Sequence, residues 1–379
     1  MDFSESENQS ELASLTRKIL TQRTMATRAA DDASGPDRFD GALWSDLAGA
    51  GVLAAALPES VGGAGLGLLD QCSVLIEIGR VVAPVPYLAS AVLGAGAIAR
   101  FGTGAQREKW VLPAGRGDLV LTAALEEEEA THAEPASDGG WRLSGVRTAV
   151  PAAPAAALFL VPAATAEGTA VFLVEPGDRG VAVERQELTS GGGAGRLVLD
   201  DVRLAADRRL GTPATGGSEP AAGESAASES AAGWLTATAT VGLCAHQAGV
   251  IARALELTAG YARTREQFGK PIGGFQAVAQ RLADAYIDAE AIRLTMWQAA
   301  WRLSEGLPAE AEIATAKFWA ADAGHRVAHT TVHVHGGVGI DLEGTPHRYF
   351  TAAKQNEFTL GGATAQLLRI GAILKDPAA

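Results

Sequence analysis

Two short segments carry residues suited to holding an anionic ligand. The first contains Arg265, Gln267 and Phe268, and the second contains Gly336 and Gly337. An arginine guanidinium binds negatively charged oxygens through paired hydrogen bonds, and glycine lets the backbone approach a ligand closely. The same residues also suit a helix cap and a tight turn, so the residue types alone leave both interpretations open.

Two other clusters invite a binding function and do not carry the rest of its signature. His325, His329, His333 and His335 recur at helical spacing, but no Glu or Asp joins them in a HExxH-type arrangement. Helix packing that leads into the glycine pair is favoured, and we predict no metal site. The run Gly191–Gly195 lacks the Lys-Ser/Thr of a phosphate loop, which favours a hairpin connection.

Composition limits the classes of protein. The chain has 379 residues, 47% of them hydrophobic, which is enough for a large core with two or three subregions. A net charge of -13 argues against a nucleic-acid binder. The polar N-terminus is unlike a signal peptide, and the long uncharged runs are broken by proline or polar residues, so no membrane span is expected. Only two cysteines are present, which fits a cytoplasmic location.

The elements that must position these residues change character along the chain. Residues 1–116 show helical spacing of apolar residues, interrupted by a glycine-rich break at 58–67. Residues 117–210 contain short apolar runs separated by turn residues, which predicts a small antiparallel barrel or sandwich. Residues 211–232 are low-complexity Gly, Ala, Ser and Glu, for which we expect a mobile loop.

Helical periodicity returns in residues 233–379. One apolar stripe covers a long helix, and a second stripe covers the next helix. The first contains Phe275, Val278, Leu282, Tyr286, Met296 and Leu303, and the second contains Ile313, Ala316, Ala320 and Val327. Long helices with short connections predict a four-helix bundle. The expected fold class is therefore α+β, in the order helical, β, helical.

Three strings in this order resemble one enzyme family. They are Tyr261–Gly273 followed by Phe275–Gln276, then His333–Ile340, and the early glycine loop Pro58–Gly67. Together they resemble the acyl-CoA dehydrogenase family over essentially the whole chain. The resemblance implies an N-terminal helical domain, a middle β-barrel and a C-terminal four-helix bundle. It also implies FAD as cofactor, an acyl-CoA substrate, an electron-transfer acceptor, and a tetramer in which each flavin site draws on two chains.

The resemblance divides the flavin-site residues into two sets, and only one is intact here. The residues that the family lends to a neighbouring chain match Arg265, Gln267, Phe268, Phe275, Gln276, His333, Val334, His335, Gly336 and Gly337. The strings that seat the flavin ring in the same chain are absent. The stretch Ala123–Ala130 contains four adjacent glutamates, expected to face water, and Thr148–Pro151 lacks the family's aromatic residue.

The family's catalytic glutamate is also missing from both of its usual positions. Gly361 occupies one, and Ala239–Thr240 occupies the other. Because neither residue can accept a proton, a self-contained site would lose general-base catalysis worth roughly 10²–10⁴-fold. Glu357 lies four residues before Gly361 and is the candidate substitute, although a solvated carboxylate at a helix end is the favoured interpretation.

Three functions remain open from the sequence. The first is a subunit of an α2β2 heterotetramer that completes the flavin site of a related, catalytic chain, with a steroid side-chain acyl-CoA as the leading substrate class. The second is a self-sufficient homotetrameric dehydrogenase with an unusual base. The third is a scaffold or acyl-CoA-binding protein without catalysis, since fold does not imply function.

Overall fold

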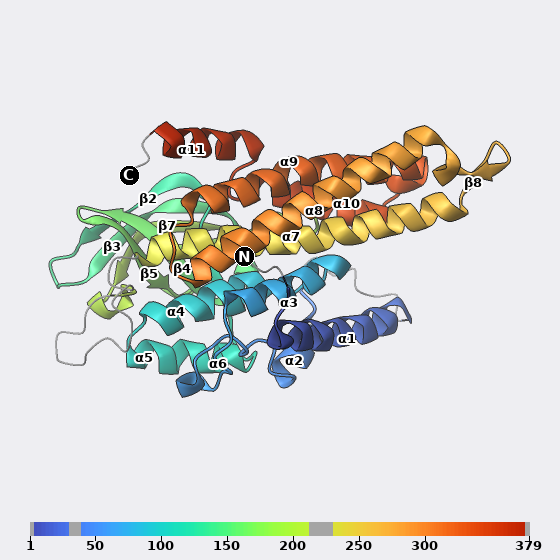
Figure 1. Cartoon of the computed structure of the whole chain (residues 1–379). Helices are drawn as coiled ribbons and strands as arrows, with labels where there is room; N and C mark the ends of the chain where they lie inside the picture. Colours follow the sequence, from blue (N-terminus) through green and yellow to red (C-terminus); the bar gives the residue numbers. More distant parts are fainter. Residues whose placement is uncertain (1–3, 30–38, 212–229, 376–379) are drawn as a thin grey trace. The chain divides into compact units, whose positions relative to one another are not determined.

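The computed structural model describes residues 4–29, 39–211 and 230–375, and its elements follow the expected order of helices, strands and helices (Figure 1). Two compact units are present. The first comprises Met1–Met25, Leu68–Ala83 and Thr240–Ala379, and the second comprises Ala26–Gly67 and Pro84–Ala239. This division follows packing rather than sequence order, so the domain boundaries expected at 116, 210 and 232 stay predictions. Most of the expected 211–232 loop lies outside the described residues.

The N-terminal third is helical, as the apolar spacing predicts. Its α-helices are α1 (Glu7–Ala29), α2 (Gly41–Gly49), α3 (Leu68–Val81), α4 (Gly96–Phe101), α5 (Gly104–Gln106) and α6 (Leu112–Gly115). Three shorter or wider helical segments connect them: η1 (Glu59–Val61), η2 (Tyr87–Ala95) and η3 (Arg107–Val111).

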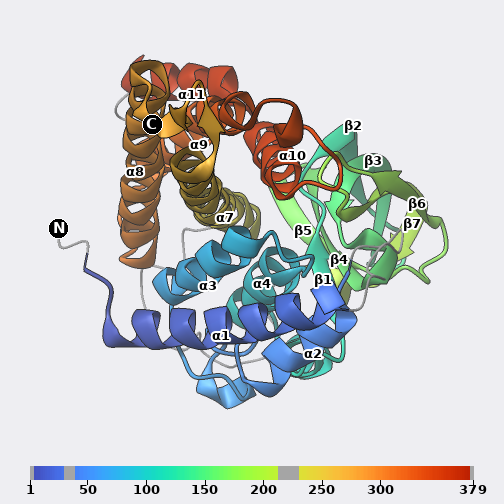
Figure 2. The same cartoon turned by 90° about the vertical axis from the view of Figure 1, so that its right-hand side faces the viewer.

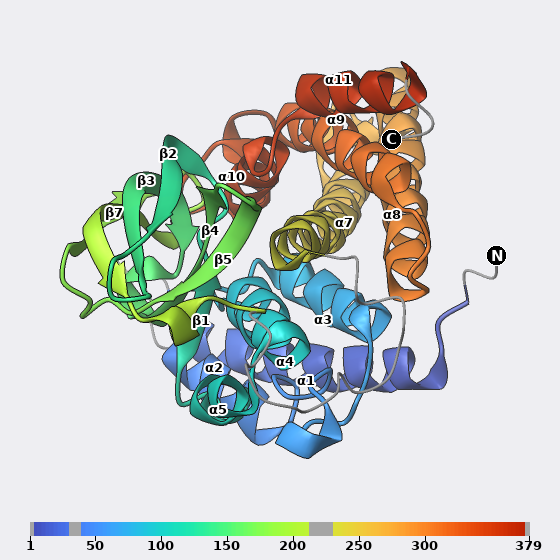
Figure 3. The ribbon, with the colours of Figure 1, turned by 90° about the vertical axis from the view of Figure 1, so that its left-hand side faces the viewer.

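A curled seven-stranded sheet forms the middle of the chain (Figure 3). Its strands are β1 (Val120–Ala123), β2 (Glu127–Pro135), β3 (Trp141–Pro151), β4 (Ala156–Thr165), β5 (Gly168–Val174), β6 (Val181–Glu187) and β7 (Gly193–Leu204). The spatial order is β1-β4-β2-β3-β7-β6, with β5 paired to β4. The expected all-antiparallel pairing is wrong at β4, which runs parallel to β1 and also, at His132 and Ala164, parallel to β2. The β2–β3 hairpin lies between β1 and β4 in sequence and gives the chain length that a parallel crossover needs.

The core of this sheet is built from residues that alternate along the strands. Leu143, Phe159, Phe172 and Leu197 are fully buried, and Trp141 packs edge-on against Phe172 with ring centroids 5.2 Å apart. The short apolar runs of the sequence therefore correspond to the buried faces of real strands. Two short 3-10 turns, η4 (Ala153–Ala155) and η5 (Ala206–Arg208), connect or follow these strands.

The C-terminal helices pack as the predicted bundle, with an additional helix. They are α7 (Ala231–Thr264), α8 (Gln276–Ser304), α9 (Glu310–His335), α10 (Thr345–Phe358) and α11 (Ala363–Lys375), and Figure 2 views them from the end that carries the β8 hairpin. The predicted stripe on α9 is buried throughout. The stripe on α8 is partly wrong, because Tyr286 is 61% exposed. By length and composition α7 is apolar enough to cross a membrane, yet 78% of its most apolar window is buried, as in a core helix.

Helices α3 and α7 cross at unusually close range within the first unit. A Cβ atom at Gly79 would lie 2.2 Å from the His246 carbonyl oxygen, and one at Gly249 would lie 2.0 Å from the Ile76 carbonyl oxygen. Only glycine allows two helix backbones to approach in this way. The crossing holds α7 against α3 ahead of the segment that carries Arg265.

Candidate functional site

The Arg265 segment forms a two-residue β-hairpin at the end of α7. Strand β8 (Glu266–Gln267) pairs with β9 (Lys270–Pro271), and the two residues between them, Phe268 and Gly269, have φ values of 54° and 77°. Two successive left-handed residues are what a tight hairpin turn of this kind requires. Figure 1 shows the hairpin projecting beyond the ends of α7 and α8, and the Phe268 side chain is 93% exposed.

Arg265 and the start of α8 offer hydrogen-bond donors at this hairpin. Arg265 is exposed, and no hydrogen bond or ion pair of its side chain occurs among the described residues. Helix α8 begins at Gln276 after the short η6 turn (Ile272–Gly274), and the preceding residue, Phe275, provides no side-chain cap. The first amides of an uncapped helix carry partial positive charge and bind anions. The segment therefore combines a guanidinium with a helix N-terminus.

The glycine pair lies at the other end of the same site, where α9 stops. Gly336 has a φ of 65° and ends the helix, with its amide donating to carbonyls of the last turn. Space around Gly336 and Gly337 is open, since a Cβ at either would meet no atom within 4 Å. His333 is exposed, whereas Val334 is buried. Val334 is therefore a core residue by its side chain.

A ring stack brings the two predicted motifs together. The rings of Tyr261 on α7 and His335 on α9 are stacked, with centroids 4.4 Å apart and an interplanar angle of 23°. Tyr261 lies one helical turn before Arg265, whose amide donates to the Tyr261 carbonyl over 2.8 Å. Residues about 70 positions apart in sequence thus form one surface, at the hairpin end of the bundle.

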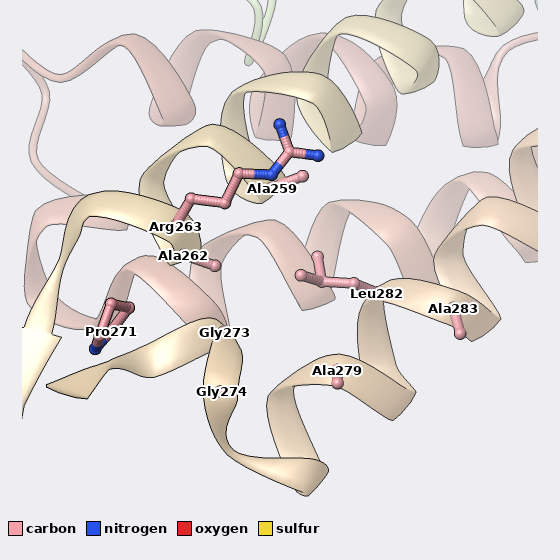
Figure 4. Close-up of a pocket in the computed structure, with 9 residues that line it drawn as sticks. All are labelled: Ala259, Ala262, Arg263, Pro271, Gly273, Gly274, Ala279, Leu282 and Ala283. Atoms are coloured by element: carbon pink, nitrogen blue, oxygen red, sulfur yellow. The ribbon is translucent and has the colours of Figure 1, made fainter.

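A shallow groove of about 510 Å³ borders the hairpin and was not anticipated from the sequence (Figure 4). Its lining is small or apolar except for one arginine, and consists of Ala259, Ala262, Arg263, Pro271, Gly273, Gly274, Ala279, Leu282 and Ala283. Gly273 packs closely against α7, since a Cβ there would lie 3.0 Å from the Ala262 carbonyl oxygen. The sequence feature that could have indicated this groove is the high content of Ala and Gly on both sides of the Arg265 string, which favours close packing.

The face of the sheet where the family's ring-binding strings occur is closed by contacts within the chain. Gln186 on β6 accepts a hydrogen bond from the Ala149 amide (2.7 Å) and donates to the Thr148 hydroxyl (2.9 Å). Thr122 donates its hydroxyl to the Pro151 carbonyl over 2.7 Å. Proline has no amide hydrogen, so Pro151 offers no backbone donor. The donors of this stretch are therefore occupied by partners from the same unit.

The glutamate run beside this face behaves as expected. Glu127, Glu128 and Glu129 are exposed. A hydrogen bond from Arg196 lowers the pKa of Glu128. Glu127 pairs with the buried Arg147, and the Glu127 carboxylate oxygen lies 2.8 Å from the Arg147 guanidinium nitrogen. These carboxylates face water and paired arginines, and this arrangement does not suit a cofactor ring that becomes anionic on reduction.

At the position expected for the catalytic base, the chain has a bare loop. Leu360 and Gly361 both have left-handed φ values, 59° and 88°. The buried Gln366 of α11 donates its side-chain amide to both of their carbonyl oxygens, over 3.0 and 3.2 Å. The loop is therefore held by its backbone and presents no acidic group. At the other position, Ala239 and Thr240 are buried on α7.

Glu357, the candidate substitute, is engaged elsewhere. It lies near the end of α10, as predicted, but its side chain is only 13% exposed. Its carboxylate pairs with Lys354 at 2.5 Å and with the Nδ1 atom of His325 at 3.1 Å. Within residues 4–29, 39–211 and 230–375, no group of three or more His, Cys, Asp or Glu residues is arranged to hold a metal.

Comparison with known proteins agrees with this architecture. The acyl-CoA dehydrogenase N-terminal domain matches residues 6–118, and the acyl-CoA dehydrogenase C-terminal domain matches residues 232–375. Acyl-CoA dehydrogenase FadE27 of Mycobacterium tuberculosis is 48% identical over 98% of each chain. A chain of the ChsE4–ChsE5 complex from the same organism is 48% identical, with a TM-score of 0.92 and full coverage of both chains. A chain of the Tcur3481–Tcur3483 steroid ACAD is 42% identical, with a TM-score of 0.88 over 98% of this chain and 99% of that one.

Members of the matched family are oxidoreductases that act on CH–CH bonds, and solved structures among them contain FAD. Because the two domain matches together span well over half of the chain, it belongs to the acyl-CoA dehydrogenase family.

Proposed function

We propose that this chain is a subunit in the FAD-dependent α,β-dehydrogenation of an acyl-CoA thioester, and that it lends flavin-binding residues to a related, catalytic partner chain. The single observation that carries the proposal is an asymmetry. Arg265 is exposed at the hairpin and the space around Gly336 and Gly337 is open, whereas the Ala149 amide and the Thr122 hydroxyl on the sheet face donate to partners within the chain.

Arg265, the start of α8 and the Gly336–Gly337 turn together form what we call the lending surface, which fits the pyrophosphate end of FAD. Arg265 supplies a guanidinium without a competing carboxylate partner among the described residues, and the uncapped start of α8 at Gln276 supplies backbone amides. Gly336 and Gly337 leave room for close approach of an adenosine group. Charge-assisted hydrogen bonds of this type contribute about 1.5–3 kcal/mol each. When bound, FAD accepts the β hydrogen of the substrate as hydride.

The chain's own sheet face does not fit the flavin ring. A ring at this position would need the Ala149 amide and the Thr148 hydroxyl, and Gln186 already satisfies both. Breaking these hydrogen bonds without replacement costs about 1–3 kcal/mol for each buried group left unpaired. We therefore expect one FAD for each pair of unlike chains, seated in the partner and completed by this chain.

The proton-transfer step supports the same division of labour. Gly361 and Thr240 cannot take the α proton, and Glu357 is ion-paired to Lys354. The base is therefore expected from the partner, which would hold the substrate thioester as well. This chain's contribution is to bind and orient the dinucleotide, and to exclude water from it.

The relatives support a heteromeric assembly and a steroid substrate. One close structural match comes from a complex of two differently named chains, and another comes from a steroid ACAD. We propose a steroid side-chain acyl-CoA as the substrate class, and an α2β2 heterotetramer as the assembly. A cytoplasmic location also stays a prediction, and it agrees with Cys72 and Cys244 being free and buried.

The test is flavin content with and without the partner. The chain is purified alone and after co-expression with a related dehydrogenase chain that retains the glutamate, and FAD per chain is read from the visible spectrum. We expect no bound flavin for the chain alone, and one FAD per two chains in the complex. A chain that is yellow, homotetrameric and active alone would overturn the proposal.

A matched pair of variants tests the lending surface directly. Arg265→Met should weaken FAD binding to the complex about tenfold or more, because a charged hydrogen bond to phosphate is lost. Arg116→Met removes an exposed arginine of the other compact unit and should leave FAD affinity unchanged. Equal affinity of both variants would remove Arg265 from the site.

A further inference from the structure

A narrow polar and aromatic seam joins α7 and α9 immediately behind the lending surface. The hydroxyls of Thr258 on α7 and Thr331 on α9 lie 3.2 Å apart. One turn further along both helices, the rings of Tyr261 and His335 stack at 4.4 Å. All four residues belong to the same compact unit.

The His335 ring is held in orientation by a hydrogen bond within its own helix. Its Nδ1 atom lies 2.8 Å from the Thr331 carbonyl oxygen. A carbonyl can only accept, so Nδ1 carries a hydrogen and donates it. The residue is 91% buried, since its relative exposure is 9%. The His335 ring is therefore held in place, and the Tyr261 ring stacks on it.

Tyr261 is connected to the hairpin by backbone hydrogen bonds, and His335 is connected to the glycine turn by the chain itself. The Tyr261 carbonyl accepts the Arg265 amide at 2.8 Å, and the Arg265 carbonyl accepts the Ile272 amide at 2.8 Å, which closes the hairpin. On the other side, His335 is followed directly by Gly336, where the chain leaves α9 with a left-handed φ. The separation between hairpin and glycine turn is therefore set through the two stacked rings.

We propose that Tyr261 and His335 are positioning residues for FAD binding, which hold Arg265 and the Gly336–Gly337 turn at the distance that the dinucleotide needs. This assignment rests on the proposed function and goes beyond it, because neither ring need touch the cofactor. It explains why a stacked pair of rings, the half-buried Tyr261 and the buried His335, lies at an end of the bundle where apolar residues would pack equally well. The pair acts through Arg265, and that dependence can be measured.

The experiment is a double-mutant cycle on the purified heteromeric complex, with FAD affinity of the flavin-stripped protein as the readout. The four proteins are wild type, Tyr261→Leu, Arg265→Met and the double variant. Stacked ring pairs contribute roughly 0.5–1.5 kcal/mol beyond burial, so Tyr261→Leu should weaken FAD binding about three- to tenfold. In the Arg265→Met background the same change should weaken binding by less than about twofold, because its effect passes through Arg265.

Two further variants separate positioning from general stability. Tyr261→Phe keeps the stacked ring and should restore wild-type affinity. Phe350→Leu removes an edge-on ring contact, with centroids 5.3 Å apart, to His329 on the same helix as His335, and should leave FAD affinity unchanged. If Tyr261→Leu does not assemble, His335→Gln removes the other ring and takes its place in the cycle.

The outcomes distinguish this inference from the proposed function. A wild-type complex that binds no FAD would defeat the proposed function. A complex that binds FAD, but in which Tyr261→Leu has no effect or has the same effect in both backgrounds, would defeat only the positioning role. Loss of affinity in Phe350→Leu equal to that in Tyr261→Leu would likewise show that the stack acts through stability alone.

Discussion

Acid should destabilise this protein through His246, a partly exposed histidine whose ring nitrogen Nδ1 faces a hydrogen-bond donor. Gln247 donates its side-chain amide to the carbonyls of Ala320 (3.1 Å) and Ala353 (3.4 Å), so its oxygen must accept. Asn356 donates to that oxygen (2.8 Å) and also to Nδ1 of His246 (3.0 Å). His246 Nδ1 therefore carries a lone pair, and a proton added there would face the Asn356 amide group.

The sign and size of the effect follow from the pKa. Burial lowers the pKa of His246 from about 6.5 to about 4. Between these values the unfolded chain binds a proton that the folded chain does not, so stability is full above pH 6.5 and is lost as pH falls toward 4. A difference of about 2.5 pH units at about 1.4 kcal/mol each gives about 3 kcal/mol in total, and about 2 kcal/mol at pH 5. His246 keeps some exposed surface, so these values are upper limits.

The assay compares wild type with His246→Gln, in which the glutamine oxygen can still accept from Asn356 but does not titrate. The free energy of unfolding in urea is followed by tryptophan fluorescence at pH 7.5, 6 and 5. From pH 7.5 to pH 5, wild type should lose up to about 2 kcal/mol more than the variant. Parallel losses in the two proteins would refute the assignment of a neutral His246.

Two further predictions concern packing in the same unit. Gly249→Ala places a Cβ 2.0 Å from the Ile76 carbonyl oxygen and should lower the free energy of unfolding by about 3 kcal/mol. The control, Gly260→Ala, lies in the same helix with open space around it and should not lower the free energy of unfolding. Urea midpoints that fall equally in the two variants would contradict the close crossing. Lys317→Met removes a fully buried ammonium that donates to two carbonyls in the last turn of α10 at 3.0 Å, and should lower stability by about 2–4 kcal/mol at pH 7; an unchanged midpoint would show that this charge is dispensable.

Some of the fold and site could be derived from local sequence signals. The apolar spacing of Ile313, Ala316, Ala320 and Val327 predicted a buried helix face, and all four residues are buried. Their side chains share a face of any α-helix, so this inference needed no partner. The apolar spacing on α8 was less informative, because Tyr286 continues the stripe in sequence yet is 61% exposed. Periodicity identifies a face, and only packing decides how much of it is covered.

The sequence by itself determined the presence of the Arg265 string, the Gly336–Gly337 pair and the missing carboxylate at position 361, since these are matters of residue identity and local spacing. Only the tertiary structure decided that Tyr261 and His335 join the two motifs, and that Gln186 accepts from the Ala149 amide and donates to the Thr148 hydroxyl. These contacts link residues about 40 to 70 positions apart, and a short-range pattern carries no record of which distant side chain will arrive. Whether a donor is open or already satisfied is therefore a property of the folded chain.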